Sequence, residues 1–94
     1  PGGTADRLDR LRDLLTDTQW DQENLETAAR GLAKELEIGA GKLFQPLRLA
    51  LTGSSASPGI FDVLVLLGRE RSLHRINTAV HIVRSGKLPL SQAD

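Results

Sequence analysis

Apolar residues recur along this chain at three- and four-residue spacing, which is the period of an amphipathic α-helix. Neither the alternating pattern of a half-buried strand nor a hairpin dipeptide occurs. The pattern therefore predicts an all-α fold, a compact bundle of about five helices. We expect these helices at about residues 5–15, 22–37, 42–52, 58–67 and 69–85, the last starting at Arg69 or Glu70.

The first predicted helix has Thr4 as its expected N-cap, and one narrow apolar face formed by Leu8, Leu11 and Leu15. The second has Asp21 as its cap, and Gly39 with Gly41 is expected to end it. Its inward positions are Leu25, Ala29, Leu32 and Leu36. Trp20 precedes the cap, where either core packing or base stacking is conceivable; the position of a hydrophobic staple favours packing.

The third helix contains Pro46, which a helix tolerates in its first turn. Three leucines fall on its inner face at four-residue spacing: Leu43, Leu47 and Leu51. Arg48 lies at the edge of that face, so its stem can pack while its guanidinium reaches outward. Gly53 is the expected stop.

The fourth helix is predicted to begin with Ser57 as N-cap and Pro58 at its first position, and to end at Gly68. Its body, IFDVLVLL, is apolar nearly all round, which predicts the most buried helix of the bundle. The fifth helix should end at Gly86. Its expected inward positions are Leu73, Ile76, Val80 and Val83.

The 94 residues are expected to form one domain, 1–94, with flexible ends at 1–4 and 87–94. There is no cysteine, so disulfides and thiolate metal sites are excluded. No apolar run is long enough to span a bilayer and no signal peptide is recognisable, which predicts a soluble, cytoplasmic monomer without a membrane partner. The start at Pro1, with no methionine anywhere, suggests a fragment of a longer protein.

Charge is distributed unevenly although the net charge is zero. Residues 1–40 hold five basic and nine acidic side chains, whereas residues 41–94 hold seven basic and three acidic ones. The basic set of the second part could face phosphates, or could simply be solvated. Its members are Lys42, Arg48, Arg69, Arg71, Arg75, Arg84 and Lys87, of which Lys42, Arg69, Arg71 and Arg75 are the candidate phosphate contacts.

No catalytic or metal site is predicted. His74 and His81 are seven residues apart, about 10.5 Å along one helix, which is too far to share a zinc ion. The serines at 54, 55 and 57 have no histidine or lysine nearby in the sequence and fit turn and capping chemistry. The GAGK segment at 39–42 lacks the spacer and the preceding strand of a phosphate-binding loop.

Binding chemistry is concentrated at the start of the fourth helix. The amides of Gly59, Ile60 and Phe61 have no intrahelical acceptors there, and Ser57 can satisfy only one of them. They could bind a phosphate or a base edge, while Ile60 and Phe61 could offer apolar surface to an unstacked base. Alternatively, SPG at 57–59 is only a helix start.

Four linked segments are similar to the C-terminal anticodon-binding domain of bacterial glutamyl-tRNA synthetases. They are QPLR at 45–48, ALTG at 50–53, SPGIF at 57–61 and LGRER at 67–71. The likeness, with matching spacing, covers about residues 8–83; the extension beyond Val83 departs from shorter members. It implies an all-α domain that binds the anticodon loop of glutamate tRNA, joined to the rest of a synthetase through its N-terminal side.

By this resemblance, Gln45 and Arg48 contact anticodon bases, with Arg48 near the first base. Ser57, Pro58, Gly59, Ile60 and Phe61 form the turn that holds the first and second bases. The family's ATP- and Mg-dependent catalytic part has no counterpart here, so this chain is expected to hold no cofactor and to be non-catalytic. Neither has the preceding helical domain, which by resemblance reads the third base and helps separate glutamate from glutamine acceptors.

Two other readings stay open on the residues alone. The fourth and fifth helices could form a helix-turn-helix DNA-binding pair, with Arg69, Arg71, His74 and Arg75 on the recognition helix. The bundle could instead bind another protein and no nucleic acid.

Overall fold

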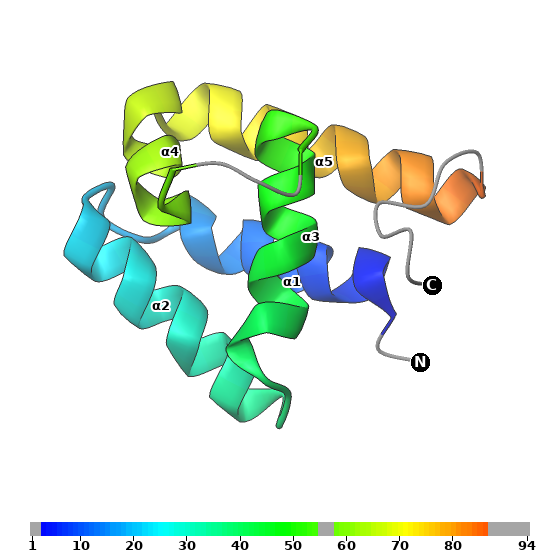
Figure 1. Cartoon of the computed structure of the whole chain (residues 1–94), viewed down its shortest axis with the longest axis horizontal. Coiled ribbons are helices and arrows are strands. Elements are labelled where there is room, and N and C mark those ends of the chain that lie inside the picture. Colours follow the sequence, from blue (N-terminus) through cyan, green and yellow to red (C-terminus); the bar gives the residue numbers. More distant parts are fainter. Residues whose placement is uncertain (1–2, 55–57, 87–94) are drawn as a thin grey trace.

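The computed structural model describes residues 3–54 and 58–86, and α-helix is the only regular secondary structure within these ranges. Figure 1 shows them as α1 (Thr4–Thr16), α2 (Gln22–Glu35), α3 (Ala40–Thr52), α4 (Ile60–Leu67) and α5 (Arg69–Ser85). The all-α fold predicted from the apolar spacing is confirmed.

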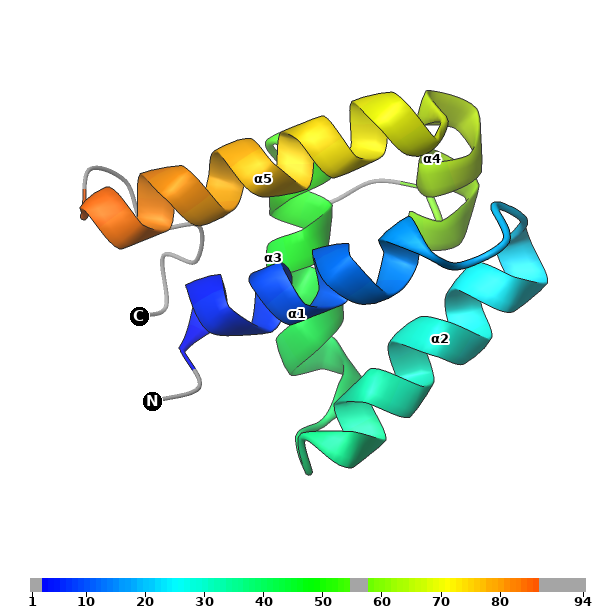
Figure 2. The same cartoon turned by 180° about the vertical axis from the view of Figure 1, so that it is seen from behind.

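The helices fall into two pairs that both contact α3: α1 with α5, and α2 with α4. Helices α1 and α5 run antiparallel and pack along each other, and α3 crosses both of them on one side (Figures 1 and 2). Helices α2 and α4 pack against each other and against α3. As a result α2, α3 and α4 form one face of the molecule, with α1 behind α3 in Figure 1 and in front of it in Figure 2.

The core is built mainly from leucines on the predicted faces. Leu8, Leu11 and Leu15 of α1 are fully buried, and Leu25, Ala29 and Leu32 of α2 are buried with them. The remaining core members are Ala5, Ala33, Leu43, Leu47, Leu51, Ile60, Phe61, Leu64, Ile76, Ala79 and Val80. Leu36, Leu73 and Val83 are partly buried against this cluster.

One predicted N-cap is confirmed and another is wrong. The Asp21 carboxylate accepts the backbone N–H of Asn24 at 2.8 Å, which lowers the pKa of Asp21 and caps α2. Thr4, in contrast, is the first residue of α1, and Gly3 stands at the N-cap without a side-chain hydrogen bond. Thr4 is therefore helical, although it was assigned to a flexible end.

The connection from α2 to α3 differs from the prediction. Helix α2 ends at Glu35, and Glu37 takes the left-handed conformation, with φ of 58°. The N–H groups of Ile38 and Glu37 donate to the carbonyls of Ala33 and Lys34, each at 3.0 Å, which is the hydrogen-bond pattern of a Schellman motif. Because this motif already ends the helix, the glycines that follow are free to start α3, with Gly39 as its N-cap.

The position of Pro46 also differs. Helix α3 begins at Ala40, which places Pro46 at its seventh residue and not in its first turn. Pro46 has no N–H to donate to the carbonyl of Lys42, so the helix loses one bond and continues. Buried packing of Pro46 and its leucine neighbours holds this segment helical.

Helix α4 is shorter and less buried than predicted. It begins at Ile60 with Gly59 at the N-cap, two residues after the predicted start. Leu66 is 88% exposed and Val65 44% exposed, so α4 is not covered on all sides, although three of its eight residues, Ile60, Phe61 and Leu64, are buried. Its one polar residue, Asp62, is exposed, and the exposed Val65 and Leu66 follow three and four residues later on the same side of the helix. The other side packs toward α2, α3 and α5.

The glycine stops predicted for α3, α4 and α5 are confirmed. Gly53, Gly68 and Gly86 each have positive φ, between 73° and 85°, and follow directly on α3, α4 and α5. This backbone conformation favours a residue without a Cβ atom.

We predict that Glu37→Gly stabilises the protein by about 0.5–1 kcal/mol. A left-handed L-residue costs about 1–2 kcal/mol, and the greater freedom of glycine in the unfolded chain offsets part of this gain. Urea unfolding followed by circular dichroism measures it. Lys34→Gly, in the last turn of α2, serves as control and should destabilise by up to about 1 kcal/mol. A loss of stability in both variants would contradict the strain at Glu37.

Candidate nucleic-acid interface

Two of the predicted base contacts lie together on α3. Gln45 and Arg48 are one helical turn apart and both are half-buried. A terminal N–H of Arg48 donates to Oε1 of Gln45 at 3.4 Å. An arginine and an amide in this arrangement offer several donors and one acceptor, the groups that read base edges.

The turn before α4 supplies the other predicted contacts. Pro58 and Gly59 are exposed, whereas Ile60 and Phe61 are only 5% and 7% exposed. Their side chains pack into the core, so the expectation that they offer apolar surface to a base was wrong. What this turn can present is its backbone and the Pro58 ring; Ser57 lies outside the described residues.

The amides at the start of α4 lie next to a negative charge. The first bond of the helix runs from Val63 N–H to the Gly59 carbonyl at 3.1 Å, which leaves the preceding amides without helical acceptors. A Cβ atom built on Gly59 would lie 3.2 Å from Oδ2 of Asp62, whose Oδ1 accepts an N–H of Gln22. The carboxylate disfavours a phosphate here, and a neutral acceptor on a base edge suits the amides better.

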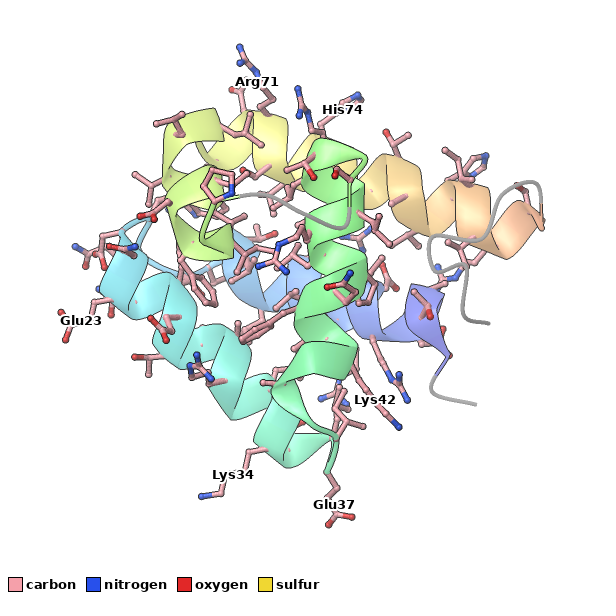
Figure 3. All side chains as sticks on the ribbon, in the orientation of Figure 1. Glu23, Lys34, Glu37, Lys42, Arg71 and His74 are labelled. Carbon is pink, nitrogen blue, oxygen red and sulfur yellow. The ribbon has the colours of Figure 1, made fainter. Side chains whose placement is uncertain are left out.

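The candidate phosphate contacts fall into two groups. Arg69 donates to the carbonyls of Thr16 and Thr18 at 2.5 and 2.9 Å, and Arg75 to that of Leu51 at 2.5 Å. These two arginines therefore satisfy the carbonyls at the ends of α1 and α3. Lys42 and Arg71, in contrast, extend away from the bundle (Figure 3).

Arg84, in the last turn of α5, pairs with acidic residues of the protein itself. It forms ion pairs with Asp6 at 3.0 Å and Asp9 at 3.3 Å, which fasten α5 to α1. The hydrogen bond to Asp6 raises the pKa of Arg84. Lys87 lies outside the described residues.

Trp20 contacts both α4 and Arg69. Its indole N–H donates to the Leu64 carbonyl at 2.9 Å, its ring packs against the core, and the Arg69 guanidinium lies 5.2 Å from the ring centroid. The prediction that Trp20 packs in the core is confirmed.

Two of the four residues expected on a DNA-recognition helix are already engaged within the protein. Arg69 and Arg75 already donate to helix-end carbonyls, which leaves Arg71 and His74 to face outward (Figure 3). A shallow hollow lies beside them at the turn between α4 and α5. Two side chains are few for reading a duplex.

The described residues contain neither a metal-binding cluster nor a membrane-spanning helix. No group of three metal-ligating side chains comes together in the ranges 3–54 and 58–86. Over the same ranges, no helix has the length and apolar character needed to cross a membrane.

Sequence reasoning missed a set of residues that joins α2 to this face. Arg30 of α2 lies over the Phe44 ring, with 5.3 Å from its Cζ to the ring centroid. The Phe44 and Phe61 rings meet edge to face at 5.3 Å. Arg30 belongs to the acidic part of the sequence, so its charge alone gave no signal; only the tertiary packing brings it here.

Comparison with known proteins places these observations in a family. Residues 1–80 match the family model described as an anticodon binding domain. Glutamate–tRNA ligase 1 of Sphingopyxis alaskensis is 55% identical over 80 residues, which are 85% of this chain and 16% of the relative. Glutamate–tRNA ligase of Thermus thermophilus is 46% identical over 67 residues, covering 71% of this chain and 14% of the relative.

A solved structure has the same fold. It is a crystal structure of a glutamate tRNA ligase from Elizabethkingia meningosepticum in complex with its amino acid, with a TM-score of 0.82 and 28% identity. The match covers 86% of this chain and 16% of that one. This chain thus spans about one sixth of the length of the proteins it matches.

We predict that Arg69→Ala destabilises the fold by about 1–2 kcal/mol, because it removes the hydrogen bonds to the Thr16 and Thr18 carbonyls and the contact with Trp20. Thermal unfolding measures the loss. Arg71→Ala, two residues away and exposed, should change stability by less than about 0.5 kcal/mol. Equal effects of the two substitutions would show that Arg69 is only a surface charge.

Proposed function

The chain belongs to the anticodon-binding domain family, and we propose that it binds the anticodon loop of glutamate tRNA. It would do so as the C-terminal domain of a glutamate–tRNA ligase, in support of the ATP-dependent ligation of glutamate to that tRNA. The relatives named above are glutamate–tRNA ligases, which supports this assignment of the parent activity.

The observation that carries the proposal is the hydrogen-bonded pair of Gln45 and Arg48 on α3. The planar Arg48 guanidinium can donate to two acceptors of one base, and the Gln45 amide limits where it points. Phe44, directly before Gln45, meets Phe61 in the first turn of α4, so this part of α3 lies beside the start of α4. A base turned out of its stack can therefore meet side-chain donors from α3 and backbone amides from α4.

We propose that this chain takes no part in the chemical step itself. Its role in the ligation is positional, since a bound anticodon fixes where the distant acceptor end of the tRNA lies. The purified chain should then show glutamate-dependent ATP–pyrophosphate exchange at the background level. Exchange above background would overturn this part of the proposal.

We predict that Arg48→Ala weakens binding of the cognate anticodon stem-loop by about 1–3 kcal/mol and reduces discrimination at the first anticodon base, because a directed contact to a base edge is lost. Titration of stem-loops that differ only in the anticodon measures both effects, with circular dichroism as the test of folding.

Arg84→Gln is the matched control for this prediction. It removes the same charge, but from an arginine paired with Asp6 and Asp9 between α1 and α5. It should leave the preference among anticodons unchanged. Equal losses for the two variants, independent of anticodon sequence, would mean that the domain offers only a charged surface.

A further inference from the structure

Building on the anticodon-binding role proposed above, we infer that Arg30 of α2 binds a backbone phosphate of the anticodon loop. This contact would extend the RNA-binding surface from α3 and α4 onto α2. It would add affinity without reading a base.

The position of Arg30 is fixed by contacts across three helices. Its guanidinium lies 5.3 Å from the centroid of the Phe44 ring, and that ring meets Phe61 edge to face, with planes at 88°. Phe61 lies in the first turn of α4, two residues after the exposed Gly59. Arg30 is thus held beside the point where α3 and α4 come together.

The geometry of α3 brings Arg30 near the predicted base contacts. Phe44 and Arg48 are four residues apart and so lie on one helix face, about 5–6 Å from each other at their Cβ atoms. Gln45 follows Phe44 directly. Arg30 therefore stacks on the residue one helical turn before Arg48, which brings it toward the nucleotides that Arg48 would contact.

Arg30 retains the donors that a phosphate needs. Its Nε donates to Oε2 of Glu26 at 2.7 Å, while among the described residues its two terminal amino groups have no hydrogen-bond partner. The Phe44 ring covers one face of the guanidinium. The edge with its N–H groups remains for a ligand, and two N–H groups on one edge match two phosphate oxygens.

The ion pair with Glu26 does not prevent this contact. The Arg30 side chain is 56% exposed and the Glu26 side chain 42% exposed, and pairs in such surroundings contribute little stability. An RNA phosphate can share the guanidinium with Glu26 or replace it. The Glu26 carboxylate should nevertheless repel the RNA. Removing its charge should therefore have the opposite effect to removing that of Arg30.

The experiment measures binding of a fluorescently labelled anticodon stem-loop to the 94-residue chain over a range of salt concentrations. Arg30→Gln should reduce the slope of log affinity against log salt by about one unit, because one phosphate contact is lost. The loss of affinity should be the same for every anticodon. Arg30→Lys should retain most of the slope, since it keeps the charge.

Two further variants act as controls. Arg10→Gln removes the same charge from another arginine that is paired with a glutamate, Glu35, but that lies on α1; its slope should match the wild type. Glu26→Gln should strengthen binding at low salt, because it removes a negative charge beside the phosphate.

The outcomes separate this inference from the proposed function. If Arg48→Ala alters anticodon preference while Arg30→Gln keeps the wild-type slope, only the role of Arg30 is overturned. Equal slope losses for Arg30→Gln and Arg10→Gln would overturn it as well, because they indicate diffuse charge. If the wild type does not distinguish the stem-loop from an unrelated RNA, both proposals fail.

Discussion

The backbone carbonyl of Leu64 accepts hydrogen bonds from the Trp20 indole, the Ser72 hydroxyl and the Gly68 amide. Helix α4 has eight residues, too few for a helix to be stable in isolation. These bonds fix its C-terminal end to the loop before α2 and to α5. At its other end Phe61 packs against Phe44. The turn that would meet the anticodon is therefore positioned by contacts made through the whole length of α4.

The same demand for hydrogen bonds at helix ends engages two of the arginines that the sequence offered as phosphate contacts. Arg69 and Arg75 satisfy carbonyls near the ends of α1 and α3, and Arg84 is occupied by two aspartates. The charge available on the α2–α3–α4 face then comes from a few residues with separate tasks. In this account Arg48 reads a base, and Arg30 holds a phosphate.

The sequence predicted many local features because they depend on near neighbours, although it misplaced the cap of α1, the end of α2 and the start of α4. Helix periodicity, the Asp21 cap and the stop at Gly68 follow from spacing and backbone chemistry. Features set by packing between distant segments were not predictable. The carbonyls that engage Arg69 belong to residues more than fifty positions earlier in the chain. In α4 a single polar residue, Asp62, marks the side on which Leu66 stays exposed. The linked segments located Gln45 and Arg48, whereas Arg30 became visible only through its contact with Phe44.

The central claim is that the α2–α3–α4 face binds an anticodon loop. Amide chemical shifts of the isotopically labelled chain, followed during titration with an anticodon stem-loop and separately with duplex DNA, test it most directly. The account predicts that the stem-loop shifts amides around Arg30, Gln45, Arg48 and Gly59, and that DNA produces only weak, scattered changes. Changes concentrated around Arg71 and His74 on α5, or stronger changes with DNA, would contradict it.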